Sequence, residues 1–408
     1  MKKRLVVIGG GAAGLMAAAT AAQNGADTIV LEKMPRCARK IMITGKGRCN
    51  LTNNTDVNGL MSAVRTNGKF LYSAFNNFTA KDTMEFFENA GVPLKTERGN
   101  RVFPVSDKAV DVVDALVGFV KMSGVKILNE SAVEIKTQNG RVTAVICQSG
   151  REIVADSVIL ATGGKSYPLT GSTGDGYEIA QKLGHTVVEP KASLVGVETR
   201  ESFCASLAGL SLKNVDVTLT KQGSKKAVFC DRGEMLFTHS GVSGPLVLSA
   251  SAYIKDLNCR WEIVIDLKPA LDHKKLDDRV LRDFAKFSNK KLCNALVELL
   301  PKSMIPVIIK IAGLDENITV NKISKEQRGA LVDTIKELKL TVKKLRPIEE
   351  AIITAGGIAV KEICPSNMQS RLISGLFFAG EIIDVDACTG GYNLQIAFST
   401  GRLAGQNV

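Results

Sequence analysis

Three glycines near the start of the chain have the spacing of a phosphate-binding turn. Gly9, Gly11 and Gly14 form a GxGxxG pattern. In such a pattern the first glycine permits a tight turn, the second lets the backbone approach a pyrophosphate, and the third packs a helix against a strand. The helix N-terminus then offers free N–H groups and a partial positive charge to the phosphates. We therefore expect this turn, including Ala12 and Ala13, to bind a dinucleotide.

The elements around the turn support this interpretation. Residues 5–8 and 27–31 read as short buried strands, and residues 12–24 as a helix that ends at Gly25. Glu32 lies eighteen residues after Gly14, close to the spacing of about 20 at which an acid binds the adenosine ribose, and Lys33 follows it. The alternative is a glycine-rich structural turn. The motif does not separate NAD from FAD.

Two later segments resemble parts of known flavoproteins. The run VILATGG ends in Ala161, Thr162 and Gly163, and it is similar to the second nucleotide-contact segment of flavoproteins with two dinucleotide domains. The TGDG sequence at residues 173–176, followed by a helical stretch, resembles the fumarate reductase and succinate dehydrogenase flavoprotein superfamily. These likenesses imply that the nucleotide is FAD.

The C-terminal region adds a further pair of motifs. GLFFAG at residues 375–380 reads as a buried strand that ends at Gly380, and Glu381 follows. In flavoproteins of this type an acid at this place holds the ribityl and pyrophosphate region of FAD. TGGYNLQ at residues 389–395 opens the last helix, whose N–H groups would stabilise negative charge on a reduced flavin.

Three long segments together resemble one family of bacterial flavoproteins. They are KIMITGKGRCNLTN at residues 40–53, FTHSGVSGP at 237–245 and the whole of 375–405. The family is often described as NAD(P)/FAD-dependent oxidoreductases, and it includes 3-dehydro-bile-acid Δ4,6-reductase and aminoacetone-oxidase-like flavoproteins. The resemblance covers essentially the whole chain. Ala38 and Lys46 depart from it, because the family often has glycine at both places.

The resemblance implies a set of FAD contacts beyond the first motif. These are Lys40, Gly47, Arg48, Asn50, Val133, Ala161, Thr162, Gly163, Gly380, Glu381, Gly391, Asn393, Leu394 and Gln395. NADH or NADPH would act as a transient electron donor, since the chain has no second GxGxxG for a dedicated nicotinamide domain.

Three residues are candidates for the chemistry itself. Arg48 could meet flavin or a substrate oxygen with a permanent charge, or it could brace its loop together with Asn50 and Asn53. His239 could donate a proton, although Thr-His-Ser-Gly is also good turn chemistry. Tyr392 could donate a proton to the substrate or stack near the flavin ring.

The nine cysteines are scattered and never form a CxxC pair. This pattern argues against a disulfide framework and a structural zinc site, and it favours a reducing compartment, so we expect a cytoplasmic protein. Cys49 and Cys388 flank the expected flavin region, where a redox-active pair is the less favoured reading and packing the better one. No cluster of His, Asp, Glu or Cys predicts a metal.

The predicted fold is α/β. A discontinuous Rossmann-like FAD-binding domain, with a parallel sheet and a β-meander at residues 125–161, would comprise residues 1–190 and 347–408. An inserted substrate domain, first β and then helical, would occupy residues 191–346, with a break at Pro190 and a crevice for ligands beside the FAD domain. The insertion should contain strands at residues 215–220, 226–230 and 261–267 and helices at 274–287, 289–300, 302–312 and 325–338.

The charge and hydropathy of the chain indicate which kinds of partner it binds. The formal charge is +12, its lysines are spread out, and aromatic residues are only 5%. We therefore expect attraction for small anions and no nucleic-acid partner. The apolar stretch at residues 5–22 mimics a signal peptide, but its glycines indicate a strand, turn and helix instead of a membrane span. The oligomeric state is not readable from the sequence.

Three functions remain open. The first is an NAD(P)H-fed reductase of an activated C=C bond in an organic substrate, such as a steroid or bile-acid enone. The second is an oxidase of a small amine such as aminoacetone, with dioxygen as acceptor. The third is a non-catalytic flavoprotein that binds RNA, which the sequence supports least because it contains no RNA-reading module.

Overall fold

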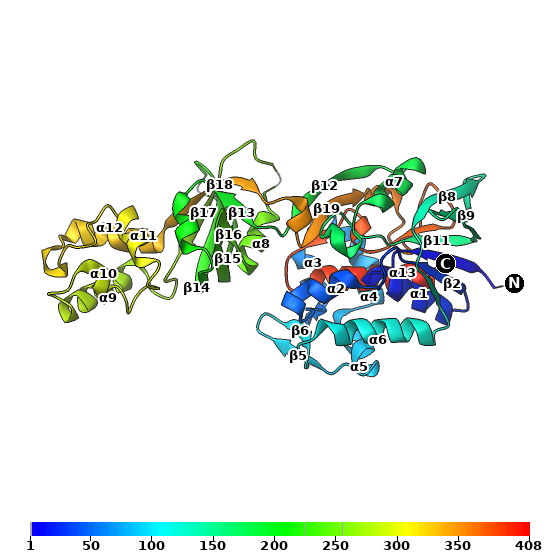
Figure 1. The fold of residues 1–408 in the computed structure, drawn as a ribbon, viewed down its shortest axis with the longest axis horizontal. Coiled ribbons are helices and arrows are strands. Elements are labelled where there is room, and N and C mark those ends of the chain that lie inside the picture. The colour runs from blue at the N-terminus through cyan, green and yellow to red at the C-terminus, as the bar shows by residue number, and fades with distance from the viewer. Residues whose placement is uncertain (1, 225, 255) are drawn as a thin grey trace. The chain divides into compact units, whose positions relative to one another are not determined.

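The computed structural model describes residues 2–224, 226–254 and 256–408. The chain forms two compact units. Unit 1 comprises Met1–Ser193 and Pro347–Val408, and unit 2 comprises Leu194–Arg346. Each unit has its own hydrophobic core, and Figure 1 shows the helices and strands of both units.

Unit 1 is built on a five-stranded parallel sheet with the order β20-β11-β1-β2-β7. Its strands are β1 (Arg4–Ile8), β2 (Asp27–Leu31), β7 (Lys126–Leu128), β11 (Ser157–Leu160) and β20 (Leu376–Phe378). The apolar runs of β1, β11 and β20 are buried nearly throughout, as expected for strands covered on both faces. The predicted α/β class with a Rossmann-like FAD domain is thereby confirmed.

The last helix of the chain packs directly on the first. The helices α1 (Ala12–Gln23) and α13 (Tyr392–Gln406) lie side by side (Figure 1). A Cβ at Gly401 would stand 2.4 Å from the carbonyl oxygen of Ala13, and one at Gly405 would stand 2.4 Å from that of Ala17. Only glycine permits this approach, so the two ends of the chain form one core.

The predicted meander at residues 125–161 is only partly correct. Its three-stranded antiparallel sheet contains β8 (Ala132–Gln138), β9 (Arg141–Cys147) and β10 (Glu152–Val154). The first and last runs of the predicted meander, β7 and β11, belong to the parallel sheet instead. Alternation marks the half-exposed meander strands, whereas β11 is apolar on both faces and pairs in the interior.

Pro190 does not break its strand, contrary to the prediction. It lies within β12 (Val187–Ser193), which pairs with β19 (Ile353–Ile358). The pairing register shifts between Val188 and Lys191, so Pro190 occupies a bulge. A proline at a bulge of a two-stranded ribbon removes no ladder hydrogen bond, which explains why the strand continues.

Smaller elements complete unit 1. The helices are α2 (Arg39–Ile43), α3 (Val57–Ala63), α4 (Tyr72–Asn77), α5 (Ala80–Asn89), α6 (Ala109–Met122) and α7 (Asp175–Lys182). The strands β3 (Thr52–Asn53), β5 (Leu94–Glu97) and β6 (Arg101–Pro104) form a three-stranded sheet, and β4 (Val64–Thr66) pairs with β21 (Asp386–Ala387).

Unit 2 contains a closed six-stranded barrel with the order β13-β16-β15-β14-β17-β18. Its strands are β13 (Val197–Thr199), β14 (Ser211–Lys221), β15 (Ala227–Thr238), β16 (Gly241–Ser243), β17 (Trp261–Asp266) and β18 (Leu338–Leu345), and α8 (Pro245–Ser251) follows β16. The strand β18 closes the barrel, and the sequence analysis missed it. Leu338, Leu340 and Val342 alternate as its buried residues.

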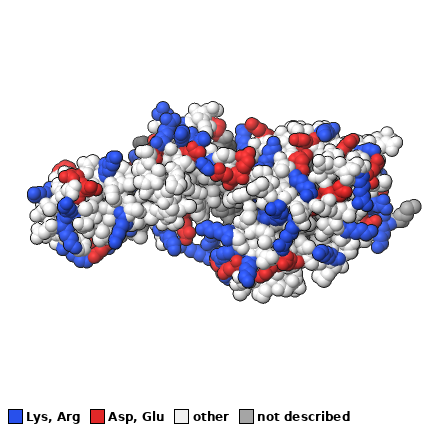
Figure 2. Space-filling model, viewed as in Figure 1, with Lys and Arg blue, Asp and Glu red and all other residues white. Residues whose placement is uncertain are grey.

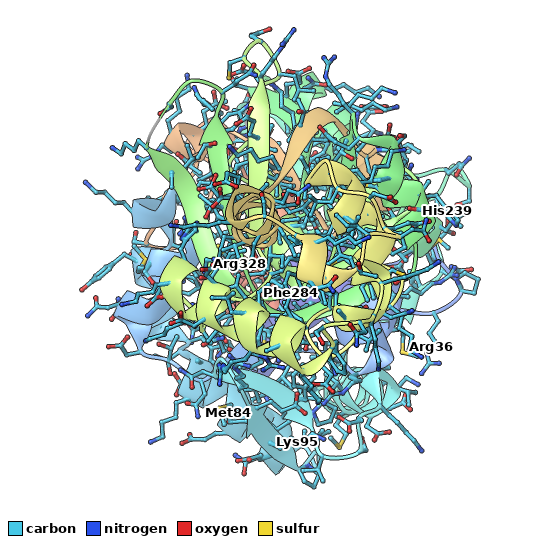
Figure 3. All side chains as sticks on the ribbon, turned by 90° about the vertical axis from the view of Figure 1, so that its left-hand side faces the viewer. Arg36, Met84, Lys95, His239, Phe284 and Arg328 are labelled. Atoms are coloured by element: carbon cyan, nitrogen blue, oxygen red, sulfur yellow. The ribbon has the colours of Figure 1, made fainter. Side chains whose placement is uncertain are left out.

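A helical part is inserted between β17 and β18. It contains α9 (His273–Lys286), α10 (Leu292–Ala295), α11 (Ile305–Ile311) and α12 (Lys325–Lys336). The predicted helix at residues 289–300 is wrong in length, since only Leu292–Ala295 is helical. Phe284 of α9, labelled in Figure 3, is 8% exposed and belongs to the core of unit 2.

Within the described ranges, no helix is long and apolar enough to cross a membrane. All nine cysteines are free thiols. Among the residues described, no group of three or more His, Cys, Asp or Glu side chains is arranged to hold a metal ion.

Candidate cofactor site in unit 1

The turn between β1 and α1 has the geometry that a pyrophosphate needs. A Cβ at Gly14 would stand 1.9 Å from the carbonyl oxygen of Gly9, and one at Gly9 would stand 2.5 Å from that of Ala161. A Cβ at Gly11 would meet no atom within 4 Å. The first and third glycines are therefore required by packing, whereas Gly11 leaves open space where a ligand can approach the backbone.

The N-terminus of α1 is also available to an anion. Gly11 is its N-cap, no side chain caps it, and its first turn contains no acidic residue. The first N–H groups of a helix have no partner within the helix, so they and the helix dipole face the space in front of Gly11.

Glu32 is held beside this turn. Its carboxylate accepts hydrogen bonds from the backbone N–H of Gly10 at 2.8 Å and of Met34 at 2.7 Å. Burial raises the pKa of Glu32, and the two backbone donors oppose that rise. A carboxylate has about four acceptor sites, so capacity for the hydroxyl groups of a ribose remains. Lys33, its neighbour, pairs with Asp175 at 2.8 Å.

The loop after β11 lies against the same turn. A Cβ at Gly9 would stand only 3.0 Å from the Cα of Thr162, so Ala161, Thr162 and Gly163 adjoin the glycine motif. Among the described residues, the Thr162 hydroxyl and the Asn50 side-chain carbonyl are buried without a hydrogen-bond partner. Such orphaned groups are costly unless a ligand satisfies them.

Lys40 and Glu381 meet although 341 residues separate them. The Lys40 ammonium lies 2.7 Å from the Glu381 carboxylate and 2.5 Å from the Ser166 hydroxyl. Glu381 also accepts hydrogen bonds from Ser166 and from the backbone N–H of Thr354. This cluster joins four segments of the chain at the end of β20, where the resemblance places the ribityl and pyrophosphate region of FAD.

The sequence analysis missed Ser166 and Thr354. Ser166 is fully buried, as is Thr354, and their hydrogen bonds complete the surroundings of Glu381. Both are neutral residues in segments without a recognisable motif, so no signal in the sequence marks them.

The N-terminus of α13 presents free N–H groups. Its first intrahelical hydrogen bond runs from Gln395 to Gly391, no side chain caps it, and its first turn has no acidic residue. The N–H groups of Tyr392, Asn393 and Leu394 therefore precede the helical ladder. Gly391 has φ +97°, and a Cβ there would stand 2.3 Å from the carbonyl oxygen of Thr52.

The side chains of Asn393 and Gln395 are committed within the protein. Asn393 bonds the N–H and carbonyl groups of Ala387. Gln395 is fully buried and bonds Thr52, Thr83, Ser399 and the carbonyl oxygen of Phe78. These two predicted FAD contacts therefore have their backbone groups, and not their side chains, available to a flavin.

Asn53 connects the N-terminus of α13 to a hairpin. Its amide donates to the carbonyl oxygen of Gly390 at 3.1 Å and to that of Gly99 at 2.9 Å. Asn53 is 2% exposed, so both bonds are shielded from water. The glycine pair before α13 and the β5–β6 hairpin are thereby fixed to each other.

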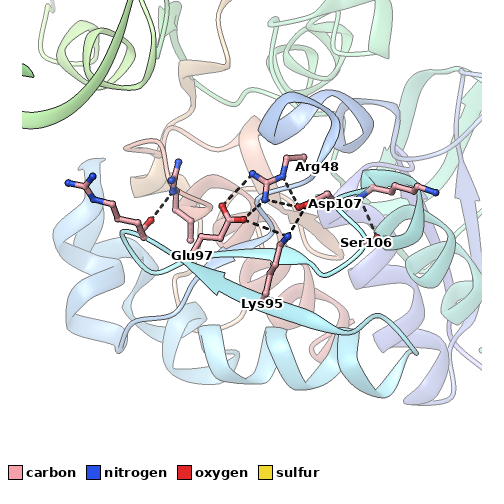
Figure 4. A network of polar contacts seen from close by, with 8 residues as sticks. Arg48, Lys95, Glu97, Ser106 and Asp107 are labelled. Carbon is pink, nitrogen blue, oxygen red and sulfur yellow. Dashed lines mark hydrogen bonds and ion pairs between the residues drawn. The ribbon is translucent and has the colours of Figure 1, made fainter. Parts of the chain in front are cut away.

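Arg48 is held by two carboxylates. Its guanidinium bonds Glu97 and Asp107 and lies 4.2 Å from the ring centre of Phe103, and Lys95 pairs with Asp107 at 2.8 Å (Figure 4). The hydrogen bond from Arg48 lowers the pKa of Glu97, and that from Lys95 lowers the pKa of Asp107. This arrangement favours the bracing role of Arg48 over a direct catalytic one.

Tyr392 and His239 lie in different units. Tyr392 begins α13, and burial raises the pKa of its hydroxyl. Its ring lies 3.0 Å from the place where a Cβ of Gly390 would stand. His239 belongs to the exposed turn between β15 and β16 of unit 2, at the edge of the barrel in Figure 3. Tyr392 therefore adjoins the predicted cofactor residues of its own unit.

The remaining predicted contacts have these positions. Val133 is 41% exposed and lies at a shift in the pairing of β8 with β9, so its backbone is free of the regular ladder. Gly47 has φ +84°, and a Cβ there would meet nothing within 4 Å. Cys49 is fully buried, and burial raises the pKa of its thiol to about 12, which leaves it unreactive.

The two positions that depart from the family pattern have a backbone conformation that favours glycine. Ala38 and Lys46 have φ values of 58° and 60°. Glycine adopts this left-handed region freely, whereas other residues pay roughly 1 kcal/mol or more there. The chain therefore keeps the backbone that glycine would favour, at some cost in stability.

The residues fit an FAD molecule. Two uncapped helix N-termini, an open space in front of Gly11, an acid at the end of β2 and two orphaned polar groups all occur in unit 1. The N-terminus of α1, the open space in front of Gly11 and the acid at the end of β2 suit the pyrophosphate and the ribose of FAD. The N-terminus of α13 suits an electron-rich ring.

Comparison with known proteins agrees with this geometry. Residues 3–407 match a family model described as HI0933-like protein Rossmann domain. The chain is 31% identical over 411 residues to 3-dehydro-bile acid delta(4,6)-reductase of Clostridium scindens, which covers 99% of this chain and 98% of that protein. It is 32% identical over 400 residues to ribosomal RNA dihydrouridine synthase of Haemophilus influenzae, covering 97% and 96%. The second likeness removes the support for the predicted absence of a nucleic-acid partner.

A solved structure shares the fold. The 3-ketosteroid-Δ4-(5α)-dehydrogenase of Rhodococcus jostii has a TM-score of 0.53 and 16% identity, covering 100% of this chain and 96% of that chain. At this level of identity the likeness concerns the fold alone.

Proposed function

The chain belongs to the HI0933-like family of FAD-binding Rossmann proteins, and from this premise we propose that it is an FAD-dependent reductase of a C=C bond conjugated to a carbonyl group. That it is a flavin-dependent oxidoreductase follows from the family and its relatives. The bond that it reduces and the donor that feeds it are our proposal, with NADH or NADPH as the donor.

The reaction class rests on the full-length relatives. One is named as a reductase of bile-acid double bonds, and another as a synthase of dihydrouridine in ribosomal RNA. Dihydrouridine is uridine whose C5=C6 bond, conjugated to the C4 carbonyl, has been reduced. Both products therefore arise when hydride adds to an electron-poor carbon and a proton adds to its neighbour.

The residues of unit 1 suit this chemistry. A bound flavin supplies the hydride. The N–H groups at the start of α13 would stabilise negative charge on the ring, and Lys40 and Glu381, which bond each other near the end of β20, would hold the cofactor. Tyr392, whose hydroxyl has a pKa that burial raises, is the proposed proton donor.

For the substrate we favour uracil in RNA. Unit 2 contains 26 lysine and arginine residues against 18 aspartate and glutamate residues, so this unit holds +8 of the total charge of +12. Basic side chains are visible over both units in Figure 2, with acidic ones among them. An excess of this size attracts a polyanion and gives salt-dependent binding, whereas a bile acid offers one carboxylate.

The test is a product assay. The holoenzyme is incubated without oxygen with NADPH or NADH and either ribosomal RNA that lacks dihydrouridine or a 3-oxo-4-ene bile acid. We expect a mass gain of about 2 Da, from two added hydrogens, in a uridine of the RNA. Gain in the bile acid alone would keep the reaction class and replace the substrate. RNA binding without gain in either substrate would contradict the reductase and support a non-catalytic flavoprotein.

A further inference from the structure

The loop between α2 and β3 holds a lysine in a conformation that suits glycine. Gly45, Lys46 and Gly47 have φ values of 57°, 60° and 84°, so three consecutive residues lie in the left-handed region. Glycine adopts this region freely, whereas a residue with a Cβ is strained there. Strained residues of this kind cluster at active sites and ligand clamps. We therefore looked for a use of the Lys46 side chain that offsets the strain.

The loop has a fixed shape. The backbone N–H of Cys49 donates to the carbonyl oxygen of Thr44 at 3.1 Å, which closes the loop at its base. A Cβ at Gly45 would stand 2.9 Å from the backbone nitrogen of Asn50, so the loop folds tightly onto Asn50. Lys46 lies in the middle of this loop and is exposed to solvent.

The charge of Lys46 is not compensated by the neighbouring ion pairs. Arg48, two residues later, bonds both Glu97 and Asp107. Lys95 pairs with Asp107 at 2.8 Å (Figure 4). Two cations thus balance two carboxylates in this cluster. Within the described part of the chain, Lys46 itself forms no ion pair, so its ammonium group is available to a ligand.

Both ends of the loop are joined to predicted cofactor residues. Before the loop, the Lys40 ammonium lies 2.7 Å from the Glu381 carboxylate. After it, Asn53 donates to the carbonyl oxygen of Gly390, just before α13. Among the described residues, the side-chain carbonyl of Asn50 at the end of the loop is buried without a hydrogen-bond partner. Such a group indicates a ligand beside the loop.

We infer that Lys46 binds an oxyanion of the substrate beside the predicted cofactor site. In RNA this group is a phosphate next to the target nucleotide, and in a bile acid it is the carboxylate. A lysine ammonium binds either group as a point charge. Because the loop is fixed at both ends, the charge stays in one place relative to the predicted cofactor residues and orients the substrate. This inference rests on the proposed function, since it requires an anionic substrate.

The test uses the holoenzyme with Lys46→Gly, Lys46→Gln and Lys46→Arg. Lys126→Gln is the matched control, because Lys126 is exposed in β7 and forms no ion pair with any residue that the structure describes. The dissociation constants are measured at two salt concentrations for a short uridine-containing RNA, a 3-oxo-4-ene bile acid and a neutral 3-oxo-4-ene steroid. The FAD content and melting temperature of each protein are measured in the same samples.

We expect Lys46→Gly to weaken binding of an anionic probe about tenfold, the scale of one lost charge-assisted contact. Its melting temperature should nevertheless rise by about 1–4 °C, because glycine relieves the backbone strain. Lys46→Gln should lose the same affinity without this rise, and Lys46→Arg should retain most of the affinity. The control should bind every probe as the wild type does.

The three probes identify the oxyanion. Weakening confined to the RNA, with a slope of log K against log salt that falls by about 0.7, assigns Lys46 to a phosphate. Weakening confined to the bile acid assigns it to the carboxylate. Equal weakening for the neutral steroid would overturn the inference, because that probe carries no charge for Lys46 to bind.

Equal affinity of the wild type and Lys46→Gln for both anionic probes would also overturn the inference. When the wild type reduces one of these probes, that result leaves the proposed function intact. Slower flavin reduction of Lys46→Gln by NADPH but not by NADH, at unchanged substrate affinity, would assign the lysine to the donor's phosphate and contradict the inference. If the variants lose affinity for a probe that the wild type never reduces, the anion site stands and the proposed function fails.

Discussion

Gly11 is the residue at which cofactor binding and folding separate most cleanly. A Cβ added at Gly11 would stand in open space, whereas a Cβ added at Gly9 or Gly14 would collide with nearby backbone atoms. We expect Gly11→Ala to fold with an unchanged melting temperature but to bind FAD at least about tenfold more weakly, because the methyl group occupies the approach of the pyrophosphate. The flavin absorbance retained after gel filtration measures this.

Gly118→Ala is the matched control for Gly11→Ala. Gly118 lies within α6, and a Cβ there meets nothing within 4 Å. This substitution should leave FAD binding unchanged and stabilise the protein by about 0.5–1 kcal/mol. Full retention of FAD by Gly11→Ala would place the pyrophosphate elsewhere.

The orphaned hydroxyl of Thr162 gives a second prediction. Thr162→Val removes a buried group that has no partner among the described residues. The FAD-free protein should gain up to about 1 kcal/mol of unfolding free energy, while its affinity for FAD falls several-fold. Calorimetric unfolding and a flavin titration measure the two effects.

Ser157→Ala is the control that separates an effect on FAD binding from an effect on stability alone. The Ser157 hydroxyl is also buried and without a partner, but it lies at the start of β11, at the opposite end of that strand from Thr162. It should stabilise the protein without loss of FAD affinity. Equal FAD affinity of wild type and Thr162→Val would remove Thr162 from the site.

His185 makes the stability of unit 1 depend on pH. Its buried ring bonds Ser370 at 2.9 Å and Glu362 at 3.2 Å, and burial lowers its pKa from 6.5. Below pH 6.5 the unfolded chain therefore binds a proton that the folded chain does not, and stability present above that pH is lost as the pH falls. His185→Gln should flatten this slope between pH 7 and pH 5.

Chemical unfolding at several pH values tests the His185 prediction. His273, with a side chain that is 57% exposed, is the control, and His273→Gln should retain the slope. A slope that persists in His185→Gln would assign the acid sensitivity to other groups.

At the scale of single residues, the sequence predicted the roles of those residues whose spacing has a direct chemical meaning. The roles of Gly9 and Gly14 and the place of Glu32 follow from a local motif, and the structure has them side by side. The hydrogen-bond partners of Arg48 and Gln395 could not be predicted from the sequence, because these partners are distant in the chain. Gln395, for example, bonds Thr52, which is 343 residues away.

At the scale of elements, Asn53 joins the β5–β6 hairpin to α13. Asn53→Ala would leave the carbonyl oxygens of Gly99 and Gly390 without this donor in a buried place. We expect a loss of about 1–3 kcal/mol of unfolding free energy, together with a lower kcat, since the N-terminus of α13 loses its brace. Asn54→Ala, which removes only an exposed 3.4 Å contact with Thr96, should do neither. An unchanged kcat in a stably folded Asn53→Ala protein would contradict the coupling.

Elements were predictable where the pattern is local and uniform. The strands β1 and β2 and the helix α1 lie within one residue of their expected ends. The assignment of β7 and β11 to the parallel sheet was not predictable, because it depends on pairing with strands far along the chain. The strand β18 was overlooked because its lysines at residues 339, 343 and 344 hide the alternation of buried residues.

At the scale of the whole molecule, unit 2 has the features of a domain that folds by itself. It has a closed barrel and its own core, and the backbone N–H of Arg346 donates to the carbonyl oxygen of Gly196 at 2.9 Å. Its two ends are therefore adjacent, as in domains that tolerate insertion or excision. We expect residues 194–346 alone to unfold cooperatively and bind no FAD. Unit 1, with Ser193 joined to Pro347 by a short Gly/Ser linker, should still bind it.

Circular dichroism of the excised unit 2 and flavin absorbance of the joined unit 1 test this division. Flavin bound to the excised unit 2 would contradict it. The sequence analysis predicted that the chain returns to the FAD-binding domain at Pro347. It did not predict the closed barrel, because closure depends on the pairing of β17 with β18, which the whole helical part separates in the chain.

The most direct test of the account is anaerobic flavin spectroscopy on the purified protein. NADH and then NADPH are added while the flavin band is followed, and RNA or a 3-oxo-4-ene bile acid is added to the reduced sample. We predict that one nicotinamide bleaches the band and that one substrate restores it without oxygen. A band that neither nicotinamide bleaches, but that a small amine does, would contradict the reductase and identify an oxidase fed by its own substrate.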